Sequence, residues 1–199
     1  MGIFVFNGIR SRETSARDTV LRALPKGGVG VEIGVWKGDF SARILKIARP
    51  KRLHLVDPWR VSDEPDRRGE AWYGAERISQ AEMDAIHDRV AGRFSAQIAA
   101  DRVRLHRNPS REAMAEFADD SVDFVYIDGD HSLAAVGEDL RAALRVTRPG
   151  GFLICDDYLL GQWWGDGVVR AVHAFLVAAP VVVDSKRDTQ MILRKLPSA

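Results

Sequence analysis

The stretch DFVYIDGDHS, residues 123–132, joins a short apolar run to a cluster of polar and charged side chains. Its apolar part, residues 124–127, has the length and composition of a buried strand. Asp128, Gly129, Asp130 and His131 follow at once. Charged groups at the end of a buried strand carry a desolvation cost unless a ligand, a metal ion or water compensates it. We therefore predict that a functional site begins where this strand ends.

Strand and helix patterns alternate on both sides of this stretch. Further strands are predicted at 29–34, 52–57, 102–108 and 152–157, and helices at 14–24, 39–48, 132–147 and 168–179. Asp39 is the predicted N-cap of its helix, and residues 148–151 (RPGG) are predicted to turn the chain into the strand at 152. Residues 181–195 are predicted to form a hairpin with a polar turn at 184–188. The sequence thus predicts an α/β fold with a Rossmann-like, doubly wound, mostly parallel seven-stranded sheet and a C-terminal antiparallel hairpin.

The length of 199 residues and the 46% of hydrophobic residues suit one domain, 1–199. Within it, residues 1–26 are expected to be a tail followed by a helix. Residues 60–95 are expected to be an insertion, with a polar first half and then a helix that carries Met83, Ile86, Val90 and Phe94 on one stripe. This insertion is either a lid over the site or a dimer face, so a homo-oligomer is left open.

The net charge and the single cysteine limit the partners and the cellular compartment that we expect for the protein. A net charge of +1 without a long basic run predicts no nucleic-acid partner. No segment has the roughly 20 apolar residues that cross a bilayer, and the first residues do not resemble a secretory signal. Cys155, in an apolar stretch, is expected to be a small core residue in a reducing compartment. We expect a cytoplasmic protein without a membrane partner.

A glycine turn follows the first predicted strand in VEIGVWKGDFS, residues 31–41. Gly34 and Gly38 let the backbone approach a ligand, and the helix beyond them begins with unpaired N–H groups. The spacing differs from that of the dinucleotide fingerprint, and Glu32 would repel a pyrophosphate but attract an ammonium group. A nicotinamide oxidoreductase is therefore disfavoured. The alternative is that the two glycines make only a tight turn.

Other strand ends carry polar groups that suit a nucleoside. Asp57 ends the second strand, where an acid can accept hydrogen bonds from ribose hydroxyls; the alternative is an Asx-turn before Pro58. Asn108 and Ser110 end the third strand and are candidates for the edge of a base. Aromatic residues are candidates for the same site. Trp59 either flanks an adenine or fills the core. Trp163 and Trp164 either line a substrate pocket or anchor their loop to the core.

The strands at 123–127 and 152–157 are expected to be neighbours, with their carboxyl ends side by side. Asp128, Asp156 and Asp157 would then converge, and a hard divalent cation such as Mg²⁺ would relieve their repulsion. The alternative is that one acid caps a helix, another orients the glycine turn and only one touches a ligand. His131 is a candidate base, a hydrogen-bond donor or a helix-start residue, and Asp130 is similarly open.

These motifs together resemble the class I S-adenosylmethionine-dependent methyltransferases, from about Gly27 to the final hairpin. YIDGDHS followed by PGGFLICDDY resembles the small branch that includes macrocin-type sugar O-methyltransferases. The resemblance implies that Glu32, Gly34, Trp36 and Gly38 surround the methionine part of the cofactor, that Asp57 holds its ribose and that Asp128 borders the same site. It also implies Mg²⁺ at Asp128, Asp156 and Asp157, with Asp130 or His131 near the acceptor hydroxyl.

The sequence-based hypothesis is accordingly an S-adenosylmethionine-dependent, Mg²⁺-assisted O-methyltransferase that acts on a small hydroxylated acceptor. One alternative is a metal-independent methyltransferase with His131 or Asp130 as base. A second is a cofactor-binding module without catalysis.

Overall fold

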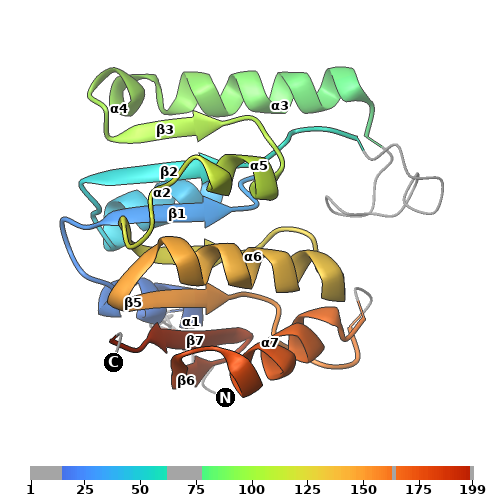
Figure 1. Cartoon of the computed structure of the whole chain (residues 1–199). Coiled ribbons are helices and arrows are strands. Elements are labelled where there is room, and N and C mark those ends of the chain that lie inside the picture. Colours follow the sequence, from blue (N-terminus) through green and yellow to red (C-terminus); the bar gives the residue numbers. More distant parts are fainter. Residues whose placement is uncertain (1–14, 62–77, 163–164, 198–199) are drawn as a thin grey trace, which may run out of the picture.

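The computed structural model describes residues 15–61, 78–162 and 165–197, which are built around a seven-stranded β-sheet (Figure 1). The strands lie in the order β3-β2-β1-β4-β5-β7-β6. Strands β1 to β5 pair in parallel, and β7 pairs antiparallel with both β5 and β6. Their bounds are β1 Val29–Ile33, β2 Arg52–Val56, β3 Val103–His106, β4 Val122–Ile127, β5 Thr147–Cys155, β6 Val181–Arg187 and β7 Gln190–Lys195.

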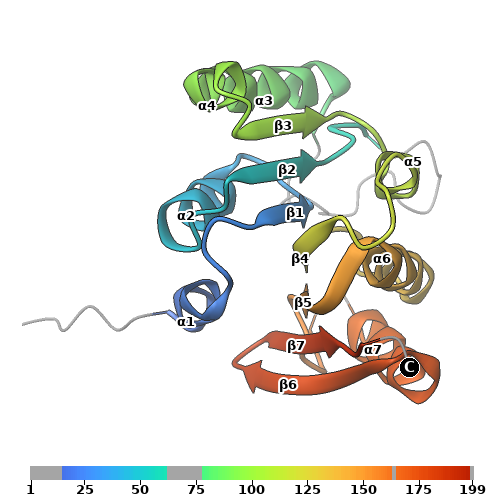
Figure 2. The same ribbon diagram turned by 60° about the vertical axis from the view of Figure 1, so that its left-hand side comes forward.

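Helices cover both faces of this sheet (Figure 2). On one face lie α1 (Ala16–Ala23), α2 (Asp39–Ile47) and α3 (Gln80–Arg93), with the short α4 (Ser95–Ala99) beside α3. On the other face lie α5 (Ser110–Ala115), α6 (Leu133–Val146) and α7 (Gly167–Ala178). All six residues of β4 are buried between the two layers. This double cover explains why the central strand appears in the sequence as a nearly continuous apolar run.

The predicted α/β architecture, with its mostly parallel sheet and antiparallel hairpin, is confirmed. The prediction that residues 184–188 form the hairpin turn is wrong, because Asp184–Arg187 continue β6 and Arg187 pairs with Gln190. The turn is therefore Asp188–Thr189. Polar residues can continue this strand because β6 is the outer strand of the sheet and most of its side chains are exposed.

One other local prediction is wrong for a steric reason. Gly38, and not Asp39, is the N-cap of α2: it has φ 74°, and a Cβ there would lie 2.9 Å from the ring of Phe94. The predicted turn at 148–151 lies within the bounds of β5, but these residues do not pair with β4: the register passes from Val122 and Thr147 to Phe124 and Phe152, and Gly150 has φ 79°. Gly151 lies so close to β4 that a Cβ on it would be 2.7 Å from the carbonyl oxygen of Asp123.

The helix expected in the second half of the insertion is α3, and Met83, Ile86, Val90 and Phe94 are buried against the body of the protein. A capping box between Ser79 and Glu82 begins this helix. The polar first half of the expected lid falls mainly on residues 62–77, which lie outside the described residues. Among the helices that the structure describes, none is long and apolar enough to cross a membrane.

Candidate active site

The carboxyl ends of β1, β4 and β5 meet at one edge of the sheet. The N–H of Asp128 donates to the carbonyl of Ile33 (2.8 Å), and the N–H of Asp156 donates to the carbonyl of Ile127 (2.9 Å). The strand order reverses at β1, which has β2 on one side and β4 on the other. Open α/β sheets bind ligands at such a reversal, beyond the carboxyl ends of the strands. The predicted site residues are thus gathered where this fold can hold a ligand.

The turn after β1 packs directly against the end of β4. Gly34 has φ 87°, and a Cβ on it would lie 2.0 Å from the carbonyl oxygen of Asp128. Only glycine fits here, for both its conformation and its lack of a side chain. Trp36 also has a positive φ of 52°, and Gly38 then begins α2. The turn brings backbone N–H groups to the edge that carries the acids.

Glu32 is a buried acid in the strand that leads to this turn. Its side chain is 1% exposed, and burial raises its pKa to about 8. Its Oε2 atom has no hydrogen-bond partner among the described residues, while the buried hydroxyl of Ser41 lies close enough to Glu32 to lower the pKa of this acid. Buried polar atoms without partners are rare in folded proteins. Glu32 therefore offers an unused acceptor beside the glycine turn.

Asp57 is buried as well, and its carboxylate fixes the backbone of the glycine turn by hydrogen bonds. Oδ2 accepts hydrogen bonds from the N–H groups of Val35 (3.0 Å) and Trp36 (2.9 Å). Oδ1 accepts one from the N–H of Trp59 (2.7 Å), which is the geometry of an Asx-turn. Trp59 itself is fully buried and donates its indole N–H to the carbonyl of Trp36, so it fills the core.

Asp156 is the most heavily hydrogen-bonded of the three acids. Its Oδ1 accepts from the N–H of Asp157 (2.9 Å), the hydroxyl of Thr189 (3.1 Å) and the amide of Gln190 (2.7 Å). Its Oδ2 accepts from the hydroxyl of Tyr126 (2.7 Å) and lies 2.6 Å from Arg17. These partners occupy both oxygens of a side chain that is 0% exposed. Protein groups already supply what a metal ion would supply to Asp156.

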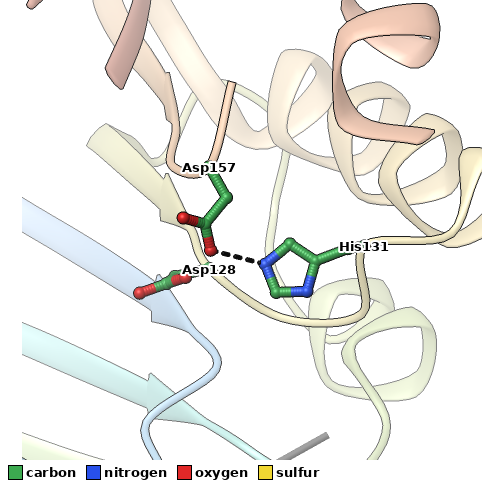
Figure 3. Close-up of side chains that lie close together, drawn as sticks. All are labelled: Asp128, His131 and Asp157. Atoms are coloured by element: carbon green, nitrogen blue, oxygen red, sulfur yellow. Dashed lines mark hydrogen bonds and ion pairs between the residues drawn. The ribbon is translucent and has the colours of Figure 1, made fainter. Parts of the chain in front are cut away.

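A different trio lies at the open side of the cluster (Figure 3). Asp128, His131 and Asp157 each offer one ligand atom, and these atoms lie within 4.8 Å of one another. Nε2 of His131 is 2.8 Å from Oδ2 of Asp157. Asp157 has φ 53°, so a left-handed backbone turns its side chain toward the histidine. The predicted convergence of acids therefore includes His131 and leaves Asp156 as an internal support.

Asp128 lies near both the buried Asp156 and the pair formed by His131 and Asp157. Burial and then the Asp156 carboxylate raise the pKa of Asp128 well above its usual value, while Arg17 acts in the opposite direction. Nη2 of Arg17 is 3.6 Å from Oδ2 of Asp128. A carboxyl in this setting favours a cation beside it.

The remaining predicted site residues lie in the segments that follow β3 and β4. Oδ1 of Asp130 accepts the N–H of Ser132 (2.7 Å), just before α6 begins. Asn108 follows β3 and donates a long hydrogen bond (3.4 Å) to Glu112. Ser110 is the first residue of α5. Trp163 and Trp164 lie outside the described residues.

A family model described as a methyltransferase domain matches residues 31–158 of the chain, which include most of β1, all of β2 to β5 and the whole acid cluster. The chain belongs to the class I S-adenosylmethionine-dependent methyltransferases.

The methyltransferase is also similar to a curated protein of Mycobacterium sp. (strain JLS) named "Putative O-methyltransferase". The two are 28% identical over 120 residues, which are 58% of this chain and 54% of the relative. The match therefore spans about half the length of that protein.

Solved structures support the fold of the methyltransferase. One is a "putative rRNA-methylase" from Clostridium thermocellum, with a TM-score of 0.63, 13% identity and coverage of 92% of this chain and 95% of the other. Another is a "putative methyltransferase" from Streptococcus mutans in complex with SAH, with a TM-score of 0.57, 12% identity and coverage of 91% and 96%. At these identities the likeness concerns the fold alone.

The sequence predictions missed Arg17, Tyr126, Thr189 and Gln190, which surround Asp156. One signal for Arg17 was present: it lies three, four and seven residues before Val20, Leu21 and Leu24, which form the buried stripe of α1. A charged residue on the apolar stripe of a helix must find a partner inside the protein. Tyr126, in contrast, has the pattern of a core residue, and the hydrogen bond of its hydroxyl has no sequence signature.

Proposed function

We propose that this methyltransferase transfers the methyl group of S-adenosylmethionine to a hydroxyl of a small acceptor, with His131 as the base and Mg²⁺ bound by Asp128 and Asp157. The observation that carries the proposal is the imidazole of His131, hydrogen-bonded to Asp157 and within 4.8 Å of Asp128 at the cofactor edge of the sheet. The name of the mycobacterial relative agrees with transfer to oxygen.

The residues around the glycine turn fit the cofactor. The unpartnered Oε2 of Glu32 suits the ammonium group of the methionine part, and the close packing of Gly34 on the backbone of Asp128 holds the turn beside the acids. We assign the methionine part to Glu32, Gly34, Trp36 and Gly38, with Asp128 beside it. When bound, S-adenosylmethionine supplies an electrophilic methyl group on a sulfonium.

The nucleoside part of the cofactor is assigned to the ends of β2 and β3. A carboxylate has about four acceptor sites, and backbone N–H groups use three of those on Asp57, so a ribose hydroxyl can use the fourth. Asn108 and Ser110 are assigned to the adenine edge.

His131 is suited to take the acceptor proton. In the proposed reaction Nε2 of His131 donates its proton to the Asp157 carboxylate, which only accepts hydrogen bonds when ionised, and Nδ1 acts as the basic nitrogen. The hydroxyl proton would move to Nδ1 while the acceptor oxygen attacks the methyl carbon in line, and the methyl–sulfur bond would break with S-adenosylhomocysteine as the leaving group. Asp157 would stabilise the imidazolium that forms.

The side chains at the site suit a divalent cation, but with fewer protein ligands than the sequence predicted. The predicted set of Asp128, Asp156 and Asp157 is no longer proposed, because protein donors fill both oxygens of Asp156. Mg²⁺ prefers oxygen ligands and usually binds one or two carboxylates plus water and substrate, which Asp128 and Asp157 can provide. When bound there, the ion would lower the pKa of an acceptor hydroxyl and orient it.

A metal-independent reaction is the second candidate. It is favoured by the guanidinium of Arg17, which already supplies one positive charge to the acids. Here too His131 is the better base, because a carboxylate oxygen of Asp130 is engaged at the start of α6.

The acceptor is proposed to be a small molecule in the cytoplasm. The net charge of +1, without a long basic run, gives RNA little electrostatic attraction. The free thiol of Cys155 fits a reducing compartment.

The decisive test is calorimetric titration of S-adenosylmethionine into metal-stripped protein, followed by Mg²⁺ and by turnover on a panel of sugars, phenols and other hydroxylated compounds. We expect cofactor binding without metal and a separate Mg²⁺ heat that Asp157→Asn abolishes. His131→Gln should lower kcat by roughly 100-fold or more at unchanged cofactor affinity.

His87→Gln, on α3, is the matched control and should keep full activity. A loss of activity in Asp130→Asn but not in His131→Gln would move the base to Asp130. Full activity without a divalent ion would establish the metal-independent reaction. Cofactor binding without turnover on any acceptor, RNA included, would leave a binding module.

A further inference from the structure

Helix α1 brings a positive charge into the acid cluster. Nη2 of Arg17 lies 2.6 Å from Oδ2 of Asp156 and 3.6 Å from Oδ2 of Asp128. The guanidinium also lies 5.2 Å from the centroid of the Phe40 ring, at the start of α2. Arg17 therefore joins α1 to the carboxyl ends of β4 and β5.

The two ionic contacts of Arg17 differ in kind. The contact with Asp156 is short, and that carboxylate is fully buried among other donors. The contact with Asp128 is beyond hydrogen-bond distance, and the Asp128 side chain is 20% exposed. Asp128 also belongs to the trio with His131 and Asp157. Asp128 is thus shared between Arg17 and the candidate cation site.

We infer that Arg17 is the resident counter-ion of this cluster and that it competes with a divalent cation for Asp128. The inference rests on the proposed function, because it concerns the same cation site. Two positive charges that share one carboxylate repel each other, and the repulsion is strong in a partly buried site. The two binding events are linked. The guanidinium beside Asp128 weakens the binding of the cation by some factor, and the bound cation weakens the contact of the guanidinium with Asp128 by the same factor.

Helix α1 does not depend on Arg17 to stay in place. Val20, Leu21 and Leu24 are buried against the sheet, and Asp18 accepts two hydrogen bonds from Arg43 of α2. The Arg17 side chain, which is 34% exposed, can therefore leave the cluster while the helix remains docked. The same packing should keep α1 docked in Arg17→Gln, but this variant loses the ion pair with the buried Asp156 and should be less stable than the wild type.

Mn²⁺ is the probe for the test, because its binding can be followed both by calorimetry and by the loss of the free-ion signal in electron paramagnetic resonance. We expect Arg17→Gln to bind Mn²⁺ about tenfold more tightly than the wild type, within the usual range of coupling between sites. Arg17→Lys keeps the charge and should stay close to the wild type. Arg22→Gln, on the same helix, is the matched control and should leave the affinity unchanged.

Unchanged affinity in Arg17→Gln, with clear Mn²⁺ binding by the wild type, would overturn this inference and leave the proposed function standing. Absence of Mn²⁺ binding in both proteins would overturn the inference and remove the cation from the proposed function as well.

A measurement on the wild type covers the case in which Arg17→Gln does not fold. The Nε–H resonance of Arg17, assigned by its loss in Arg17→Lys, should shift when diamagnetic Mg²⁺ is added at a concentration that saturates the site. A resonance that stays in place while calorimetry reports bound Mg²⁺ would also overturn the inference.

Discussion

Asp156 depends on residues that are distant in the sequence. Its carboxylate is held by Tyr126 from β4, by Thr189 and Gln190 from the hairpin, and by Arg17 from α1. Burial and the nearby Asp156 raise the pKa of Tyr126 well above its usual value, so the phenol stays protonated and donates. A buried charge is tolerated here because donors surround it.

Removal of one such donor should be costly. Tyr126→Phe deletes the hydroxyl that donates to Asp156 at 2.7 Å, and we expect a loss of about 1.5–3 kcal/mol in the free energy of unfolding. Tyr158→Phe is the matched control, because its hydroxyl pairs with His173 at the surface and should contribute much less. Urea denaturation measures both. Equal losses in the two variants would contradict the special role of the buried pair.

Gly34 should tolerate no side chain. Gly34→Ala would place a Cβ 2.0 Å from the carbonyl oxygen of Asp128 at φ 87°, and we expect a loss of roughly 2–4 kcal/mol in unfolding free energy together with weaker cofactor binding. Gly27→Ala is the control: it has φ 73° but open space around it, so it should cost about 1 kcal/mol. Similar losses at both positions would mean that the positive φ, and not the contact with β4, determines the loss in unfolding free energy.

Among the elements, β2 and β3 carry two histidines that face each other. Nδ1 of His54 is 2.9 Å from Nε2 of His106, and Phe117 packs on both rings. Burial and then the neighbouring His106 lower the pKa of His54 to about 4, and burial lowers the pKa of His106. Arg104 lowers both values, and Glu116, 3.9 Å from His106, raises that of His106. The pair is therefore stable only while it remains uncharged.

This pair predicts a loss of stability in mild acid. Between pH 6.5 and about 4, the unfolded chain binds a proton at His54 that the folded protein does not bind, so the free energy of unfolding falls as the pH is lowered through this range. We expect about 1–2 kcal/mol from His54, after allowance for its partial contact with solvent. Urea denaturation at several pH values should give a flatter profile in His54→Gln, whereas His173→Gln should keep the slope of the wild type.

The elements differ in how well the sequence predicts them. The parallel strands β2, β4 and β5 could be predicted, because each ends in apolar residues that are followed directly by Asp57, Asp128 or Asp156. The hairpin turn could not, because on an outer strand polar residues such as Lys186 fit the strand as well as the turn. At the site, the meeting of β4 and β5 follows from their order in the chain, whereas the arrival of Arg17 depends on where α1 docks.

In the molecule as a whole, Cys155 lies at the centre of the packed layers. It is 1% exposed in β5, and burial raises the pKa of its thiol well above the usual value. Because it is the single cysteine of the chain, its reaction reports on the whole fold.

We expect the Cys155 thiol to resist alkylating reagents in the native protein and to react with one equivalent in denaturant. At low denaturant concentration, the labelling rate should follow the free energy of global unfolding. Fast labelling of the native protein would indicate instead that β5 opens locally. The control is Cys155→Ala, which should show no labelling in either condition.

The position of β7 has a consequence for biosynthesis. Gln190–Lys195 follow β6 in the chain, yet they pair between β5 and β6 inside the sheet, and Thr189 and Gln190 support Asp156. A nascent chain that still lacks these residues on the ribosome has an unpaired edge at β5 and an under-supported carboxylate beside the site. The earlier strands can assemble first, but this carboxylate acquires its full support only after Gln190 has emerged from the exit tunnel. Completion of the site is thereby tied to the emergence of β7 from the ribosome.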